Sequence, residues 1–398
     1  MNPPEQWSAA EQFVWEKTHA GEEADFNKLE DKELDPKSPR GWDNSRRISS
    51  EFLETIMFEK PFREEVTRKG VRIIGAYFSD EIDLGDGHLP WALGLQYSRF
   101  ENGLNMGGLR ADRQVSLDGS GVKGGLNLGA ASIGNSLFMR KTTFEEAMLR
   151  GAQITGQLSM IGATVKGMLD VASISIGGAL LMAEGATFKK VILRGAQIKD
   201  QLAMRDATVT NTLDMTSVSI GGALLMDGAT FTKVMLRGAQ IGDQLSLIRA
   251  RVKGKLDMDS VSVGSALLMR ATAFAEVILR GAQIKDQLAM RDATVTGTLD
   301  MTSASVGNSL LMDGTTFADV DLGFATIGSM LNLTGGTFRA LNLTGATVEG
   351  ELRLITDNKS VNWLPDSKDH SNEIQLNLQN TQVGTLVDSP QSLSLIHI

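Results

Sequence analysis

The residues best suited to acid–base or metal chemistry in this sequence are aspartates that recur at a regular interval. Asp214, Asp257 and Asp300 are spaced 43 residues apart. If 43 residues make two layers of a repetitive fold, like carboxylates lie roughly 10 Å apart, too wide for a shared metal ion or an acid–base pair. Arginines that can pair with this row recur at Arg150, Arg194, Arg237 and Arg280. We therefore interpret the row as surface ion pairs, each contributing at most about 1 kcal/mol.

Other catalytic groups are sparse. The chain has no cysteine, which excludes thiol catalysis, disulfides and thiolate metal ligands. Its four histidines, His19, His88, His370 and His397, are scattered along the sequence. No Gly-x-Ser-x-Gly elbow, P-loop or His-Glu-x-x-His motif is present. The sequence thus predicts no catalytic residues, no cofactor, no metal site and no small-molecule ligand.

Internal repetition is the dominant feature of the chain. The segment LRGAQIKDQLAMRDATVT occurs at 193–210 and again, without a mismatch, at 279–296. Phenylalanines recur every 43 residues at Phe188, Phe231, Phe274 and Phe317. Within each repeat, apolar residues follow one another every five or six positions, commonly with a small or apolar residue two positions earlier. Residues i−2 and i lie on one side of an extended segment, so each unit predicts a short strand with two inward side chains.

The spacing of these units resembles the pentapeptide-repeat family, which has an apolar residue at the centre of each five and a small residue two positions before it. The closest matches are Ala163/Val165, Ala196/Ile198, Ala207/Val209 and Ala239/Ile241. The resemblance implies an all-β solenoid, a right-handed parallel quadrilateral β-helix with coils of 21–22 residues. The chain departs from the family because half its spacings are six, which predicts bulged corners. A shared fold does not define a function.

The pattern also predicts the limits of the regions. Residues 71–355 form the β-helix, 356–373 a polar insertion loop, and 374–388 a further, truncated coil. The final LSLIHI resembles a translated sequencing adaptor, so 389–398 are expected to be non-native or disordered. Residues 1–70 are expected to be a helical cap with a linker at 21–41.

Two helical signals support that cap. Ser8 and Glu11 have the spacing of a capping box. A second, amphipathic face is formed by Ile48, Phe52, Leu53, Ile56 and Met57. The simplest interpretation is a cap over the first coil; the alternative is a pair of helices that docks a partner.

The charge distribution argues against nucleic acid as a ligand. Residues 1–70 carry a net charge of −5, residues 71–355 of −1 and residues 356–398 of −3, which together give −9. A nucleic-acid binder would present a basic face. Neither a signal peptide nor a transmembrane segment is visible, so we expect a cytoplasmic protein, with peripheral membrane association left open.

Three features are candidates for recognition. Outward leucines recur in every second coil and predict an apolar stripe at Leu181, Leu225, Leu268 and Leu311. A register slip of one residue would instead turn these leucines inward. The segment GDGHLPW around His88 interrupts the early coils, and the 356–373 insertion contains Trp363 and His370. Ordinary loops are the simpler interpretation of both segments.

Taken together, these features predict a non-enzymatic β-helical scaffold or protein-interaction module of bacterial type, with a protein partner or self-association. Two alternatives remain open. One is a DNA-mimic inhibitor of a DNA-binding enzyme such as a topoisomerase, as some pentapeptide-repeat proteins are, although the neutral coils disfavour it. The other is a membrane-associated accessory or enzyme whose active part lies in a missing C-terminal region.

Overall fold

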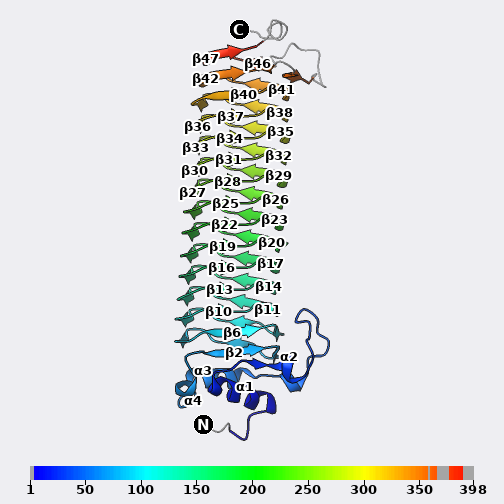
Figure 1. The fold of residues 1–398 in the computed structure, drawn as a ribbon, viewed down its shortest axis with the longest axis vertical. Coiled ribbons are helices and arrows are strands. Elements are labelled where there is room, and N and C mark those ends of the chain that lie inside the picture. Colours follow the sequence, from blue (N-terminus) through cyan, green and yellow to red (C-terminus); the bar gives the residue numbers. More distant parts are fainter. Residues whose placement is uncertain (1–3, 357–358, 365–375, 389–398) are drawn as a thin grey trace. The chain divides into compact units, whose positions relative to one another are not determined.

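The computed structural model describes residues 4–356, 359–364 and 376–388 of the chain. By its internal contacts the chain divides into two compact units, residues 1–200 (unit 1) and 201–398 (unit 2). Each unit is a right-handed parallel β-solenoid, and unit 1 begins with a small helical region (Figure 1). The predicted fold class is therefore confirmed.

The helices of unit 1 follow the predicted signals. Their bounds are α1 Ala9–Ala20, α2 Phe26–Leu29, η1 Asn44–Arg46, α3 Ser50–Phe58 and α4 Phe62–Glu65. Ser8 and Glu11 form a reciprocal capping box at α1, and Phe52, Leu53 and Ile56 of α3 are buried. In the part of the chain that the structure describes, no helix has the length and apolar character needed to cross a membrane.

The N-terminal region covers the edge of the first coil. The short strand β1 (Ala24–Asp25) pairs in parallel with β2 (Val71–Ile74) at Ile73 and Ile74, so part of that edge is covered. Residues 30–43, which follow α2, then pack against the coils. Arg99 Nη1 donates to the carbonyl of Pro36 at 2.9 Å, and a Cβ on Gly121 would lie 2.2 Å from the same oxygen. The predicted linker at 21–41 thus contains β1, α2 and a docked loop.

Each regular coil has four faces. In one coil of unit 1 they are Thr143–Phe144 (face 1), Ala147–Met148 (face 2), Gln153–Ile154 (face 3) and Leu158–Ser159 (face 4). One long strand provides faces 1 and 2, and a register shift separates its two halves. Two short strands provide faces 3 and 4. The predicted bulges are therefore confirmed, and they lie at the corner between faces 1 and 2.

The strands of unit 1 stack by face. Faces 1 and 2 comprise β3 Tyr77–Phe78, β4 Ile82–Asp83, β7 Arg99–Phe100, β8 Leu104–Asn105, β11 Gly121–Asn127, β14 Thr143–Met148, β17 Thr164–Asp170 and β20 Thr187–Ile192. Face 3 comprises β5 His88–Leu89, β9 Arg110–Ala111, β12 Ser132–Ile133, β15 Gln153–Ile154, β18 Ser175–Ile176 and β21 Gln197–Ile198. Face 4 comprises β2, β6 Leu93–Gln96, β10 Val115–Ser116, β13 Leu137–Phe138, β16 Leu158–Ser159 and β19 Leu180–Leu181.

The strands of unit 2 repeat this order. Faces 1 and 2 comprise β23 Thr208–Asp214, β26 Thr230–Met235, β29 Arg251–Asp257, β32 Ala273–Ile278, β35 Thr294–Asp300, β38 Thr316–Asp321, β41 Thr337–Asn342, β45 Asn362–Trp363 and β46 Leu376–Asn377. Face 3 comprises β24 Ser219–Ile220, β27 Gln240–Ile241, β30 Ser262–Val263, β33 Gln283–Ile284, β36 Ser305–Val306 and β39 Thr326–Ile327. Face 4 comprises β22 Leu202–Ala203, β25 Leu224–Leu225, β28 Leu245–Ser246, β31 Leu267–Leu268, β34 Leu288–Ala289, β37 Leu310–Leu311 and β40 Met330–Asn332. Faces 3 and 4 then merge in β42 Thr347–Arg353 and β47 Gln382–Val387, and β43 Ile355–Thr356 pairs with β44 Lys359–Ser360.

The core of each unit is a stack of the predicted inward residues. Ala163 and Val165 in unit 1, and Ala207 and Val209 in unit 2, are at most 1% exposed. The phenylalanines of the repeat, such as Phe231, are fully buried on face 1. The space enclosed by each coil is narrow. Small residues and single aromatic rings are enough to fill it, which explains the low aromatic content.

The 43-residue repeat has a structural cause in the long strands. In unit 2, strands of seven residues (β23, β29 and β35) alternate with strands of six (β26, β32 and β38). Each pairing of a longer with a shorter strand produces the register shift at the bulge. Coils of 22 and 21 residues therefore alternate and add up to the repeat.

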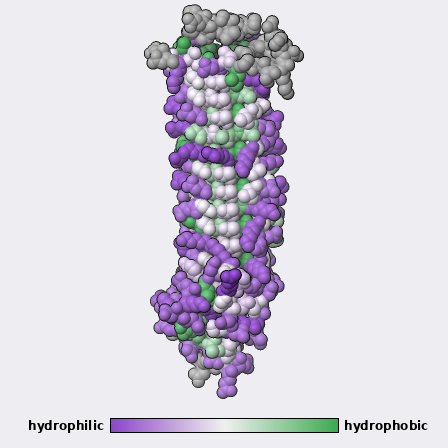
Figure 2. Space-filling view, turned by 90° about the vertical axis from the view of Figure 1, so that its right-hand side faces the viewer, coloured by the Kyte–Doolittle hydropathy of each residue, from purple (hydrophilic) through white to green (hydrophobic). Residues whose placement is uncertain are grey.

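The outward residues form columns along each unit. On face 1, Thr143 pairs with Thr164 and Thr164 with Thr187 in unit 1. In unit 2, Ser262 of face 3 lies between Gln240 and Gln283. On the side of the molecule in Figure 2, pale, weakly polar columns are bordered by hydrophilic side chains, and apolar areas are narrow strips. Most of this surface is a set of polar ladders.

Candidate interaction groove

Face 2 of unit 1 carries an outward column of mixed chemistry. Consecutive coils place these side chains in register: Asp83, Asn105, Asn127, Met148 and Asp170. We call each such position in a column a rung. Parallel strands bring neighbouring rungs within about 4.8 Å of each other. Each side chain can therefore reach the next, and the residue type at each rung decides whether the column is hydrogen-bonded.

The first three rungs form an amide ladder. Asn105 Nδ2 donates to Asp83 Oδ1 at 2.8 Å, and Asn127 Nδ2 donates to Asn105 Oδ1 at 2.8 Å. Both amide oxygens also accept a backbone N–H two residues later, which fixes the turn. The ladder ends at Met148, whose thioether cannot continue it and whose side chain leaves the residue 47% exposed.

Asp170, the rung after Met148, is paired. Its Oδ2 accepts from Arg150 Nη2 at 2.7 Å and Nε at 3.1 Å, and its side chain is only 6% exposed. The predicted Arg–Asp pairing is thus confirmed at this rung and again at Arg237–Asp257 in unit 2, where the separation is 2.6 Å. Both carboxylates are more buried than a surface ion pair would be, because the rungs above and below shield them.

A second column, here called the bulge column, precedes each inward residue of face 2. In unit 1 it consists of Glu81, Gly103, Gly125, Glu146, Met168 and Lys190. A Cβ on Gly124 would lie 2.5 Å from the backbone nitrogen of Gly103, whereas a Cβ on Gly125 would meet no atom within 4 Å. The glycines leave a hollow between the two glutamates.

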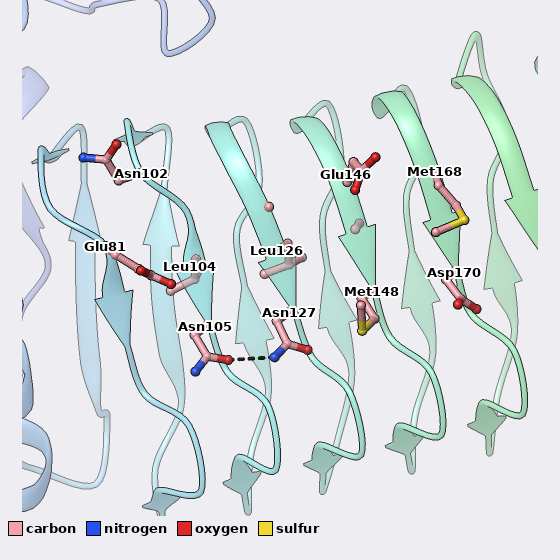
Figure 3. A pocket seen from close by; sticks show the side chains of 12 residues that line it. Glu81, Asn102, Leu104, Asn105, Leu126, Asn127, Glu146, Met148, Met168 and Asp170 are labelled. Atoms are coloured by element: carbon pink, nitrogen blue, oxygen red, sulfur yellow. Dashed lines mark hydrogen bonds between the residues drawn. The ribbon is translucent and has the colours of Figure 1, made fainter.

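The hollow and the neighbouring rungs form a groove of about 400 Å³. Figure 3 shows that its lining comes from successive coils, with Glu81 and Asn102 at one end and Met148, Met168 and Asp170 at the other. Its floor is the buried Leu104, Leu126 and Ala147, and its walls are amides, carboxylates and thioethers. The groove is therefore apolar at its base and acidic at its rim.

The rim carboxylates are electrostatically unbalanced. Glu81 and Glu146 are exposed, and among the residues that the structure describes neither has an ion-pair partner. By contrast, the adjacent Glu145 lies 2.7 Å from Lys166. Lys123, another nearby cation, lies 3.1 Å from Glu101. Lys166 and Lys123 are thus already paired with carboxylates outside the groove, and Lys190, the next cation of the bulge column, lies one rung beyond Met168 and two beyond Glu146.

The leucines predicted to form a stripe face outward, because the preceding Leu180, Leu224, Leu267 and Leu310 occupy the core. Leu181 in unit 1 and Leu268 in unit 2 are half-buried, whereas Leu225 and Leu311 are only 5% and 8% exposed. In unit 2, Ser246 and Ala289 separate the leucines along the ladder. Neighbouring rungs shield them, so the column offers little apolar surface; its role as an interface stays a prediction.

The predicted recognition loops are mostly parts of the coils. His88 lies in β5, which pairs with β9, so the segment around it does not interrupt the coil. Its Nε2 lies 3.1 Å from both carboxylate oxygens of Asp112. Trp363 lies in β45, which extends the ladder of β41, and its ring centroid is 6.2 Å from that of Phe338. Trp363 therefore belongs to the sheet, and His370 lies outside the described residues.

Sequence reasoning did not single out the groove. The relevant signal was present as the paired glycines at 124–125, which replace the usual polar residue of the bulge column. A second signal was Met148 in a column that otherwise holds Asn and Asp in this part of the chain. Neither signal indicates a groove until the strand register is known, because only the register places Glu81 and Glu146 in the same column.

The fold and the groove define a β-solenoid repeat protein. No known protein-family model matches the chain. No curated protein matches it significantly either. Among the residues that the structure describes, no group of three or more histidine, aspartate or glutamate side chains is placed to hold a metal ion.

Proposed function

We propose that this chain is a non-enzymatic β-solenoid scaffold that binds a protein partner through the groove on face 2 of unit 1. The observation that carries the proposal is the groove itself, which combines an exposed methionine, an apolar floor and two exposed carboxylates that have no ion-pair partner among the described residues. An apolar surface rimmed by polar and charged groups is typical of an interaction site, and charge complementarity then selects the partner.

The geometry of the groove supports binding rather than catalysis. Glu81 and Glu146 are three coils apart, about 14 Å at the spacing of parallel strands. The catalytic carboxylate pairs of glycoside hydrolases lie about 5–9.5 Å apart, and those of aspartic proteases are closer still. Asp170, the third carboxylate of the groove, is ion-paired with Arg150 at 2.7 Å.

Three finer sequence predictions form part of this proposal. They are membership of the pentapeptide-repeat family, bacterial origin and a cytoplasmic location. Units with a small residue two positions before the apolar centre, such as Ala163/Val165 and Ala196/Ile198, support the first, and the absence of cysteine from the sequence is in keeping with the last.

Site-specific photo-crosslinking in cells that express the full chain tests the proposal. A photoreactive residue at Met148 should give a covalent adduct with a protein. The same residue at Met235, which occupies the matching rung of unit 2 between Asp214 and Asp257, serves as the control. Equal crosslinking at the two positions, or none at Met148, would contradict the proposal.

A further inference from the structure

We propose that the groove recognises a basic, extended peptide segment of the partner, with two cationic side chains about 14 Å apart and an apolar side chain between them. This inference rests on the proposed function and adds the chemistry of the partner. It follows from three properties of the groove: its charge, its length and the position of its apolar surface.

Charge complementarity selects a cationic segment. Glu81 and Glu146 stand at the two ends of the glycine hollow, and Asp83 lies beside Glu81, where it receives only neutral donors from Asn105 and Gly85. The nearest arginine, Arg150, is engaged by Asp170. A bound lysine or arginine would thus meet a carboxylate that no residue described here has neutralised.

The spacing of the carboxylates selects an extended segment. Three coils correspond to about 14 Å. An extended chain advances about 3.3–3.4 Å per residue, so side chains four positions apart are separated by about 13–14 Å. A segment lying along the bulge column, across the strands, would place residues i and i+4 opposite Glu81 and Glu146.

The middle of the groove selects an apolar side chain. Gly125 lies beside open space, and Met148 and the half-buried Met168 border it with flexible thioethers. Methionine adapts to differently shaped apolar partners at low cost. The amides of Asn105 and Asn127 are fixed by hydrogen bonds to Asp83, to each other and to backbone groups, so they form a wall whose second N–H groups can still donate to a bound peptide.

The openness of the groove to water favours a peptide over a small molecule. Met148 is 47% exposed, and Gly125 and both glutamates are exposed as well. Small-molecule sites commonly enclose most of the ligand surface. A peptide can instead bury one side of its chain here and continue across the neighbouring coils.

The test uses the full chain and fluorescently labelled five-residue peptides, with binding measured by fluorescence anisotropy at low and high salt. The peptide Lys-Ala-Leu-Ala-Lys should bind, and its affinity should fall as salt rises. The peptide Glu-Ala-Leu-Ala-Glu should not bind. Lys-Ala-Ala-Ala-Lys should bind more weakly, because it lacks the central apolar side chain.

Charge-reversal variants locate the binding. Glu146→Lys should weaken Lys-Ala-Leu-Ala-Lys about tenfold or more, and Glu146→Gln by a smaller factor. The matched control is Glu276→Lys, since Glu276 occupies the bulge column of unit 2 and pairs with Lys255 at 3.1 Å. That variant should leave the affinity unchanged. Far-UV circular dichroism checks that each variant keeps its fold.

The outcomes separate this inference from the proposed function. Equal binding of the acidic peptide, or no effect of Glu146→Lys, would overturn the basic-peptide inference. If Met148 crosslinks a protein but the basic peptide does not bind, the groove is an interface of different specificity. If neither experiment gives a signal, both proposals fail.

Discussion

The bulge columns of the two units lie at the equivalent corner of their coils, between faces 1 and 2, but carry different side chains. In unit 1 the column contains Gly103 and Gly125 between two glutamates that have no ion-pair partner among the described residues. In unit 2 the corresponding residues are Thr212, Lys233, Lys255, Glu276, Thr298 and Asp319. There Lys255 pairs with Glu276, and Arg339 Nε donates to Asp319 Oδ1 at 2.8 Å.

The difference shows that the backbone of a coil does not decide whether its surface is open. The register shift at the bulge is present in both units. Side chains fill the column in unit 2, where Lys255 and Glu276 form an ion pair on adjacent rungs, whereas the glycines leave it open in unit 1. A groove therefore depends on a few outward residues, which can change without altering the core.

The largest expected effect concerns the Arg–Asp pair that both units share on face 2. Arg150→Ala and Arg237→Ala leave the carboxylates of Asp170 and Asp257, which are 6% and 3% exposed, without their partners. Each should lower the free energy of unfolding by about 2–3 kcal/mol, because a shielded charge is left uncompensated. Urea unfolding measures the change.

The control for that pair is Lys166→Ala, which frees the half-exposed Glu145 and should cost less than about 1 kcal/mol. If Arg150→Ala and Arg237→Ala lowered the free energy of unfolding by clearly different amounts, face 2 would not be equivalent in the two units.

The next effect separates two adjacent glycines of the groove. Gly124→Ala should destabilise the protein by about 1–3 kcal/mol, because the new Cβ would lie 2.5 Å from the backbone nitrogen of Gly103. Gly125→Ala meets no atom within 4 Å and should be neutral within about 0.5 kcal/mol. Thermal unfolding of the two variants measures the contrast, and equal destabilisation would show that the hollow is not open.

A smaller effect is expected from the amide ladders, which both units contain. Asn127 Nδ2 donates to Asn105 at 2.8 Å, and Asn342 Nδ2 donates to Asp321 at 3.0 Å. Asn127→Ala and Asn342→Ala should each cost about 1 kcal/mol, as both side chains are half-buried. Chemical denaturation measures both changes in the free energy of unfolding, and a much larger change for one variant would show that the two ladders are not equivalent.

The smallest expected effect is a pH dependence of stability in the N-terminal helical region, which the bulge columns of the two units should not show. Glu11 accepts hydrogen bonds from the N–H of Ser8 at 2.9 Å and the Oγ of Ser49 at 2.6 Å, which joins the caps of α1 and α3. Burial alone would raise the pKa of Glu11, but the hydrogen bonds from Ser49 and Ser8 outweigh it and hold the pKa below its ordinary value of 4.5. The native state therefore binds this proton less readily than the unfolded chain.

It follows that Glu11 stabilises the helical region fully above pH 4.5 and that this contribution is lost as the pH falls through the lowered pKa. Glu11→Gln should flatten the acid dependence of stability in this region. Hydrogen exchange of α1 and α3 at several pH values measures it, and an unchanged slope in the variant would argue against the assignment.

The repeat made much of the architecture predictable. Inward positions such as Val165 and Ile198 follow from the five- or six-residue spacing, since only a strand with corners buries residues at that period. The capping box at Ser8 and Glu11 is a local signal and was equally readable. The groove was not, because it depends on which residues the bulge brings next to each other one coil later.

The sequence by itself determined the coil length, the core and the alternation of outward residues, since these depend on spacing within about 22 residues. Only the tertiary structure decided how exposed each outward side chain is. Leu225 and Met148 are both outward apolar residues, yet one is 5% and the other 47% exposed. The physical reason is that neighbouring coils, not neighbours in sequence, supply the atoms that cover a side chain or neutralise its charge.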